Sequence, residues 1–432
     1  MFKTDFAIFY AVNFESAIIC LVISYLLFGL LVYRQIYSVF DPAFFFFILS
    51  ASGYSVVMLL WHKEKISDYY FFCFMISQVL FYLGWNIFSP RWKKQINRKI
   101  RIDSFSIVLY YISSTLFILL QSYVYKIMGF PIFMDSRLDA FSSGGGIGIL
   151  DRIIFVSSIF SFSFAAFRLV YLKGWRFFDV IILIFFMFTK IVSGSKLSVL
   201  EAVFLIGLIL MFHSRSVMNK SIEVRVQGKL YFFVLLSIPI ALVVTYIQQS
   251  SMSEQPLGVG ILIGKLLLRF VNTGDIFYLA WVDDYLRYIP DRAGFFALFS
   301  DSLGAARLVP RSDLPQHLGF SVMLAHTSTE NTIGPNARFN VFGLHYFGVL
   351  GLFIYSLILG VLVGYLRNRV RYRLPFTTSS LMLYTLLAYI ALYIEQDFSS
   401  MALKYFLNLA IFSFLLFPFV YLVSRYRKDT YV

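Results

Sequence analysis

The sequence predicts an all-α protein that crosses a membrane about eleven times. Of its 432 residues, 59% are hydrophobic, 20% are aromatic and only 14% are charged, whereas soluble domains carry about 25% charged residues. Apolar runs that approach the roughly 20 residues of a membrane helix recur along most of the chain. One long polar stretch, residues 248–338, interrupts them. These observations together indicate a polytopic membrane protein with one large loop.

The apolar runs are the predicted spans, and most carry charges only at their ends. Residues 5–14 are also apolar, so twelve spans remain open as an alternative. The eleven predicted spans are Glu15–Tyr33, Pro42–Trp61, Tyr69–Phe88, Phe105–Tyr125, Ile153–Tyr171, Phe177–Val192, Leu197–Phe212, Leu230–Ile247, Val341–Leu366, Ser379–Ile394 and Ala402–Val423.

The basic residues predict how the spans are oriented, because Lys and Arg gather in cytoplasmic loops near the ends of spans. With eleven spans, 21 of the 37 basic residues fall on one side, and residues 91–101 form the densest run. We expect that side and the C-terminus to be cytoplasmic, and residues 248–338 to lie outside. The net charge of +14 then reflects topology and contact with anionic lipid, and we do not expect nucleic-acid binding.

Three regions follow from this layout. Residues 1–247 form an N-terminal transmembrane bundle of about eight helices with a small external loop at 129–152. Residues 248–338 form a large external loop with interfacial helices. Residues 339–432 form a C-terminal bundle of about three helices.

The small external loop contains Pro131 and the glycine run 144–146, which exclude a regular helix. Arg137 and its acidic neighbours Asp135 and Asp139 therefore lie on a flexible loop. Such a loop can cover a ligand, or it can be a solvated surface loop whose charges pair with one another.

A tight hairpin is predicted for residues 177–212. Glu201 lies about one turn inside the membrane, where an ionisable group costs ~2.5–3.5 kcal/mol or more and usually pairs. Lys196 is a candidate partner for Glu201, or for a ligand phosphate. The alternative is a pair at the helix end, with Lys190 and Lys196 both extending to the interface.

The large loop is expected to contain helices. Gly258–Val271 is apolar but short, which suits an interfacial or re-entrant helix. Thr273–Ile289 is predicted to form a second helix, in which Asp283 and Arg287 make an i,i+4 pair. Asp301–Pro315 is predicted to be irregular.

The loop ends in a polar segment that leads into an apolar helix, Phe339–Leu366. His326, Glu330 and Arg338 lie in this segment. Polar side chains are thereby brought to the edge of the bilayer, where a long loop is often a functional site.

Several common motifs are absent from the sequence. It contains no P-loop, no GxGxxG, no HExxH and no CxxC pair. Cys20 and Cys73 both lie inside predicted spans, so we expect neither a disulfide framework nor a thiolate metal site.

The layout of about eleven spans with one large, late external loop resembles the O-antigen polymerase (Wzy) family. Two stretches are similar to that family: Asn331–Gly364, with a Pro-containing entry and a Phe-Gly-x-x-Gly helix, and Phe188–Leu200, with a Gly-Ser-Lys helix start. Arg137, followed eleven positions later by Gly148, resembles a spacing in external loops of some members. Two features depart from the family: Lys196 stands where Arg is common, and no Arg of the large loop repeats the Arg-to-Gly spacing.

The resemblance implies a GT-C-like glycosyltransferase in the bacterial inner membrane with its large loop in the periplasm. Its reaction would transfer a growing glycan from undecaprenyl pyrophosphate to the non-reducing hydroxyl of an incoming lipid-linked repeat unit. The expected partners are undecaprenyl-pyrophosphate-linked oligosaccharide, membrane lipid and a chain-length regulator protein of the same pathway.

This chemistry requires cations for the leaving pyrophosphate and a base for the acceptor hydroxyl. Candidate bases are Glu330 first, then His326 and Asp284. No cofactor is expected, and the reaction is expected to be independent of metal. The candidate pyrophosphate-binding residues are Arg338, Arg292, Arg311, Arg137 and Lys196.

Three alternatives remain. An O-antigen ligase would transfer glycan to lipid A-core and is poorly separated from a polymerase by sequence. A lipid-linked oligosaccharide flippase would be expected to have short loops and intramembrane cations lining a central cavity. A scaffolding membrane protein would make the loop charges dispensable.

Overall fold

The computed structural model of the chain describes most of the 432 residues. The described residues are 2–90, 99–134, 147–172, 176–195, 198–216, 226–231, 235, 239–240, 242–243, 246, 268, 270–291, 293–326, 334–425 and 430–431.

Helices dominate both halves of the described chain, and short 3-10 or π turns (η) extend or connect them. Up to residue 216 the elements are α1 (Phe2–Val12), α2 (Phe14–Val32), η1 (Tyr33–Gln35), α3 (Pro42–His62), α4 (Asp68–Ile87), β1 (Arg101–Ile102), α5 (Ser104–Met128), η2 (Pro131–Phe133), α7 (Ile147–Tyr171), α8 (Phe177–Val192), η3 (Ser198–Leu200) and α9 (Glu201–His213).

The later elements include the described part of the large loop. They are η5 (Asn272–Gly274), α12 (Asp275–Trp281), η6 (Val282–Tyr288), α13 (Phe295–Ala305), η7 (Arg311–Asp313), α14 (Leu318–His326), α15 (Phe339–Gly364), η8 (Tyr365–Arg369), α16 (Val370–Arg373), α17 (Thr378–Tyr393), η9 (Phe398–Ala402), α18 (Leu403–Ser424) and β2 (Thr430–Tyr431).

The chain is an all-α polytopic membrane protein. Seven of the described helices are long and apolar enough to cross a membrane: α2, α3, α4, α5, α7, α15 and α18, with the short turns that extend them. The predicted spans at 177–192, 197–212 and 379–394 form α8, α9 and α17, which are shorter. Most of the predicted span at 230–247 lies outside the described residues, so the count of eleven stays a prediction.

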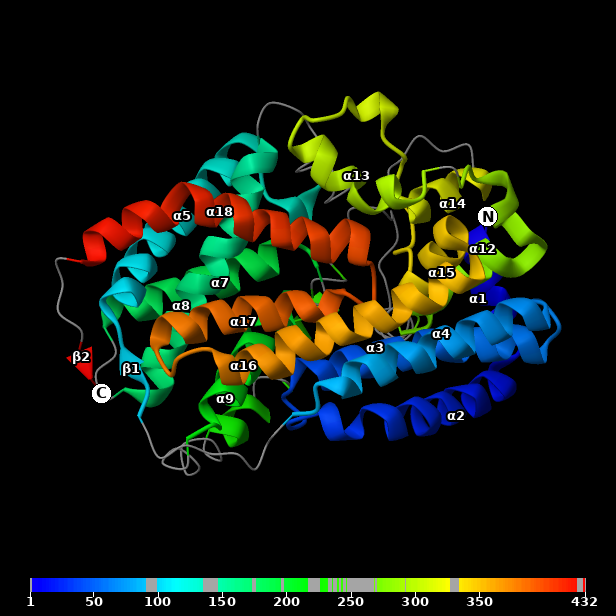
Figure 1. The fold of residues 1–432 in the computed structure, drawn as a ribbon, viewed down its shortest axis with the longest axis horizontal. Coiled ribbons are helices and arrows are strands. Elements are labelled where there is room, and N and C mark those ends of the chain that lie inside the picture. The colour runs from blue at the N-terminus through cyan, green and yellow to red at the C-terminus, as the bar shows by residue number, and fades with distance from the viewer. Residues whose placement is uncertain are drawn as a thin grey trace.

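The long helices run roughly along one direction, and the two ends of the bundle differ (Figure 1). One end, called the loop end here, carries α1, α12, α14 and the turn 63–67 between α3 and α4. The opposite end, called the tail end, carries α16 and the antiparallel pair β1–β2.

The predicted continuous helix at 339–366 is instead two limbs that meet at Gly348, where φ is 66° and ψ is −173°. A Cβ on Gly343 would lie 3.5 Å from the Cα of Leu352, although nine residues of straight helix span about 13.5 Å. The aromatic rings of Phe342 and Tyr355 also come within 6.1 Å. The first limb, residues 339–347, therefore packs back against the second.

Helix α4 shows where this hairpin lies. Phe81 stacks on Phe339 in the first limb at 5.0 Å, and its backbone also packs against Gly360 in the second limb. Asn340 donates to Ser77, near the middle of α4. The first limb therefore begins at about half the height of the bundle and rises to the loop end, as a re-entrant helix does.

A second segment, η5 followed by α12, has the same arrangement. Thr273 donates to the carbonyl of Leu49, near the middle of α3, and Gly274 lies against Gly53 and Val56. At its other end, Trp281 stacks with Tyr70, near the loop end of α4. Irregular backbone at this depth is tolerated where protein surrounds it. Residues 268, 270 and 271, which precede Thr273, are also helical, so the term re-entrant is kept for the limb at residues 339–347.

Candidate functional site

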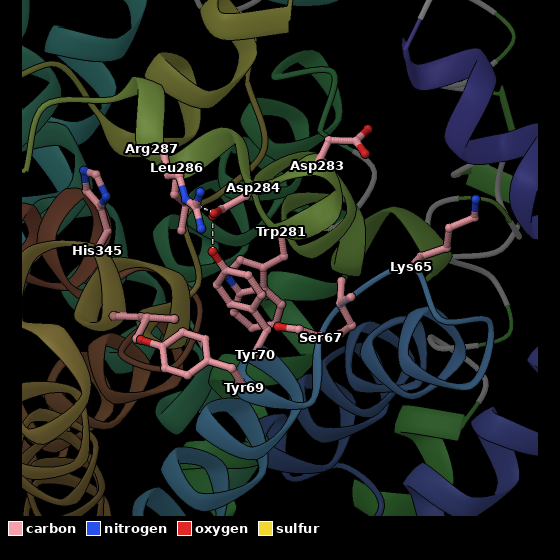
Figure 2. A pocket seen from close by; sticks show the side chains of 12 residues that line it. Lys65, Ser67, Tyr69, Tyr70, Trp281, Asp283, Asp284, Leu286, Arg287 and His345 are labelled. Atoms are coloured by element: carbon pink, nitrogen blue, oxygen red, sulfur yellow. Dashed lines mark hydrogen bonds and ion pairs between the residues drawn. The ribbon is translucent and has the colours of Figure 1, made fainter.

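A pocket opens at the loop end, where the re-entrant limb of α15 and the segment after α12 lie beside the turn between α3 and α4 (Figure 2). Its volume is about 770 Å³. It combines carboxylates, cations and aromatic side chains. The lining residues are Lys65, Ile66, Ser67, Tyr69, Tyr70, Trp281, Asp283, Asp284, Leu286, Arg287, Leu344 and His345.

Two consecutive aspartates form one wall because the backbone turns sharply after α12. Asp283 and Asp284 have φ values of 57° and 55°, in the left-handed region that side chains rarely adopt. Asp tolerates this region better than most residues because its short carboxylate can hydrogen-bond locally. Backbone strain of this kind concentrates at functional sites. The continuous helix predicted for Thr273–Ile289 is therefore wrong at this turn.

Asp284 is the polar centre of the pocket. The hydroxyl of Tyr70 donates to it, and Arg287 forms an ion pair with it (Figure 2). The expected pair between Asp283 and Arg287 is replaced by this one, because the left-handed turn changes which carboxylate faces Arg287. The Arg287 side chain is 81% exposed, so its charge is also available to a ligand in the pocket.

Aromatic side chains form a second wall of the pocket. Trp281 is buried and stacks on Tyr70, with ring centroids 5.5 Å apart. The indole Nε1 of Trp281 has no hydrogen-bond partner among the described residues. Tyr69 next to it is exposed. An aromatic face beside a carboxylate suits a polar ring such as a sugar, and Lys65 and Arg287 suit an anionic group.

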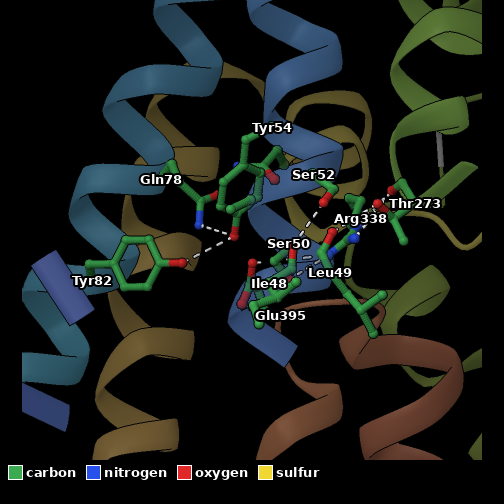
Figure 3. Close-up of polar contacts among 12 residues, drawn as sticks. Ile48, Leu49, Ser50, Ser52, Tyr54, Gln78, Tyr82, Thr273, Arg338 and Glu395 are labelled. Carbon is green, nitrogen blue, oxygen red and sulfur yellow. Dashed lines mark hydrogen bonds and ion pairs between the residues drawn. The ribbon is translucent and has the colours of Figure 1, made fainter. Parts of the chain in front are cut away.

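Arg338 caps the re-entrant limb of α15 and lies in a separate, buried cluster (Figure 3). Its Nε and Nη2 donate to the carbonyl of Thr273 at 3.3 and 3.1 Å, and its Nη1 donates to Ser50 at 3.2 Å. Glu395, which follows α17, lies 4.0 Å from the same Nη1. The cluster joins α3, η5, the re-entrant limb of α15 and the end of α17.

Burial dominates the titration of this cluster. It raises the pKa of Glu395 to about 8, although a hydrogen bond from Ser50 lowers that pKa in part. It also lowers the pKa of Arg338 to about 10. The Oε1 of Glu395 has no hydrogen-bond partner among the described residues. This carboxyl group is therefore ready to hold a proton near neutral pH.

Only some of the sequence-predicted site residues come together. Asp284 lies in the pocket and Arg338 in the buried cluster. His326 bonds the carbonyl of Leu279 at 2.7 Å and lies against the Tyr285 ring, behind the aspartate turn. Arg311 begins η7. The region predicted to be irregular, Asp301–Pro315, contains this turn and also the end of α13. Glu330, Arg292, Arg137 and Lys196 lie outside the described residues.

Glu201 forms an ion pair near the end of α8. The structure pairs it with Lys190 at 2.9 Å, and both side chains are largely buried. Lys190 stands near the end of α8; in the alternative from sequence it extends to the interface, whereas here it pairs with Glu201. The candidate pairing with Lys196 falls outside the described residues.

Two smaller expectations about the loops are also affected. Asp151 and Arg152 lie in the first turns of α7, where Asp151 faces Lys404 at 3.8 Å and Arg152 donates to Asn408 at 3.0 Å. The other expectation, a helix at Gly258–Val271, falls almost entirely outside the described residues.

Sequence reasoning did not single out four lining residues of the pocket. Tyr70 lies at the start of the predicted span Tyr69–Phe88, and Lys65 stands in a short turn without a motif. Trp281 was placed in a helix without a role, and Arg287 was expected only to pair with Asp283. The adjacency of Asp283 and Asp284 was the one signal that could have indicated a site here.

The chain matches no protein-family model, no curated protein and no solved structure. Within the described ranges, no group of three or more His, Cys, Asp or Glu side chains is arranged to hold a metal ion. Function is therefore inferred from the pocket and from the two segments beside it, η5–α12 and the first limb of α15.

Proposed function

We propose that the chain polymerises undecaprenyl-pyrophosphate-linked oligosaccharide repeat units at the periplasmic face of the bacterial inner membrane. The proposal follows the resemblance to O-antigen polymerases in Asn331–Gly364 and Phe188–Leu200. The observation that supports it is the pocket at the loop end, which combines a carboxylate, aromatic rings and cations beside helices long enough to cross a membrane.

In the proposed reaction, a hydroxyl oxygen of the incoming repeat unit attacks the anomeric carbon of the donor glycan. The bond from that carbon to the pyrophosphate oxygen breaks, and undecaprenyl pyrophosphate leaves with its electron pair. A carboxylate accepts the hydroxyl proton. Asp284 is the candidate within the described chain, and Glu330 remains the candidate in the segment before Arg338.

The groups around Asp284 suit these roles. Tyr70 donates to Asp284 and Arg287 pairs with it, so the carboxylate is held in one orientation. Arg287 and the exposed Lys65 can compensate the charge that develops on the leaving pyrophosphate, which needs no further activation. The buried Arg338 instead fixes the re-entrant limb, and its role is positioning.

The test uses purified protein in vesicles with lipid-linked repeat units. Asp284→Asn keeps the shape of the side chain but removes the base, and we expect the initial polymerisation rate to fall about 100-fold or more. Asp313→Asn, at an exposed carboxylate in η7, is the matched control and should polymerise normally. Glu330→Gln in the same assay shows which of the two carboxylates is the base.

Three results would overturn parts of this proposal. Normal polymerisation by both carboxylate variants would remove them from the site. Transfer to lipid A-core, without growth of the repeat-unit chain, would indicate a ligase. A complete loss of activity in a chelator, restored by a divalent cation, would refute the expectation of metal independence.

A further inference from the structure

Helix α13 (Phe295–Ala305) has two chemically different faces. Phe295, Phe296 and Phe299 are 75%, 41% and 44% exposed, and the spacing i, i+1, i+4 places them on one side of the helix. Ala297 and Leu298 are buried and lie on the opposite side. Three exposed phenyl rings on one helix face form an apolar patch that water does not favour.

The side of α13 opposite the phenyl rings packs against protein. Asp301 accepts from the Nε2 of His317 at 3.0 Å, and this contact raises the pKa of His317. The helix also packs against η9 and α18. The orientation of α13 is therefore fixed, and its phenyl face points away from the rest of the loop.

The phenyl face is continuous with a surface that lipid covers. The Phe295 ring lies 5.1 Å from the ring of Phe347, at the top of the re-entrant limb of α15. Just beyond the turn at Gly348, Leu350 and Ile354 are 74% and 54% exposed and lie on one stripe of the spanning limb. Exposed aliphatic side chains on a membrane-spanning helix face acyl chains, so the rings of α13 stand where this surface begins.

We infer that α13 lies in the plane of the membrane surface, with Phe295, Phe296 and Phe299 inserted among the lipid acyl chains at the loop end. It is an interfacial amphipathic helix of the kind that binds bilayers through its apolar face. The large loop is then attached to the bilayer at α13 as well as at its two ends. This inference does not depend on the proposed polymerase activity.

Nitroxide labels can test the position of α13 in vesicles of phosphatidylethanolamine and phosphatidylglycerol. Phe299→Cys and Phe295→Cys are labelled separately, and Ser312→Cys, at an exposed site in η7, is the water-exposed control. The native Cys20 and Cys73 are buried, so the wild-type protein serves as the control for background labelling. Power-saturation measurements then compare relaxation of each label by oxygen and by a water-soluble nickel chelate.

We expect oxygen to relax the labels at 295 and 299 more strongly than the nickel chelate does, and the reverse at 312. Relaxation at 295 and 299 that matches position 312 would place α13 in water and overturn the inference. Spin–spin broadening that disappears on dilution with unlabelled protein would show that a second copy of the chain covers the face, and would also overturn it. Neither outcome bears on the polymerisation assay.

Discussion

Two buried arginines, one near the tail end and one near the middle of the bundle, are held in different ways. Arg367 is fully buried near the tail end, forms an ion pair with Asp41 and donates to the carbonyl of Gln35 at 2.7 Å. Arg338 is equally inaccessible, but it donates to one carbonyl and one hydroxyl and faces Glu395 across 4.0 Å. The first arginine is tightly paired, and the second is not.

The carboxylates explain this difference. Asp41 accepts backbone N–H groups from Tyr37 at 2.7 Å and Ala43 at 3.0 Å. Burial raises the pKa of Asp41, but the Arg367 charge and the bond from Ala43 both lower it in part and favour the ionised form. Glu395 leaves its Oε1 without a hydrogen-bond partner among the described residues, and burial raises its pKa. The Arg367–Asp41 pair is therefore a fixed clamp, whereas the Arg338 cluster contains a carboxyl group that can change its charge.

The largest expected effect is at the clamp. Arg367→Met leaves Asp41 buried, hydrogen-bonded and unpaired, and we expect a loss of about 3–5 kcal/mol of stability. Arg338→Met should cost less, because Glu395 can become neutral. Thermal unfolding in detergent, read by the loss of monodisperse protein, measures both. Equal losses of stability in the two variants would remove the distinction between the Arg367 and Arg338 sites.

The second effect is the pH dependence of the Arg338 cluster. The pKa of Glu395 is raised on folding, from an ordinary value of 4.5 to about 8, so its protonated form stabilises the fold at low pH. That stabilisation is lost as pH rises between those values, by roughly 1.4 kcal/mol per pH unit. We expect Glu395→Gln to remove this loss, so that the variant melts above the wild type at pH 8.

Melting temperatures measured from pH 6 to pH 9 check this prediction. Glu64→Gln, at an exposed position in the turn between α3 and α4, is the control and should follow the wild type. If Glu395→Gln is instead destabilised by the same amount at every pH, the carboxylate is ionised and paired with Arg338. The Arg338–Glu395 pair would then be a clamp like the Arg367–Asp41 pair.

The spans α3 and α4 were predictable from sequence. The predicted spans Pro42–Trp61 and Tyr69–Phe88 became Pro42–His62 and Asp68–Ile87, because the length of an apolar run and its charged ends determine where a membrane helix begins and stops. The partner of Arg367 was not predictable. Arg367 was assigned to the cytoplasmic basic residues, and its pairing with Asp41 joins segments more than three hundred residues apart.

At the loop end, sequence reasoning found the region but not its geometry. Asp284 was a candidate base, but its contacts with Tyr70 and Arg287 depend on two left-handed residues that no periodic pattern reveals. The re-entrant limb was missed because residues 339–366 are uniformly apolar, so a hairpin and a straight helix have the same hydropathy. Glu395 was recognised only as the end of a span.

The smallest effect tests the hairpin that carries Arg338. Gly348 has φ 66° and ψ −173°, a region that is essentially restricted to glycine, and forcing a side chain into it costs about 1–3 kcal/mol. We therefore expect Gly348→Ala to lower the melting temperature, although a Cβ there would meet no neighbouring atom within 4 Å. Gly148→Ala, in α7 and equally unobstructed, is the matched control and should be neutral or slightly stabilising, because its φ is ordinary and Ala favours helix. If both variants melt alike, residues 339–364 form one continuous helix. The first limb would then not return to the middle of α4, and Arg338 would lose its place beside Ser50 and Glu395.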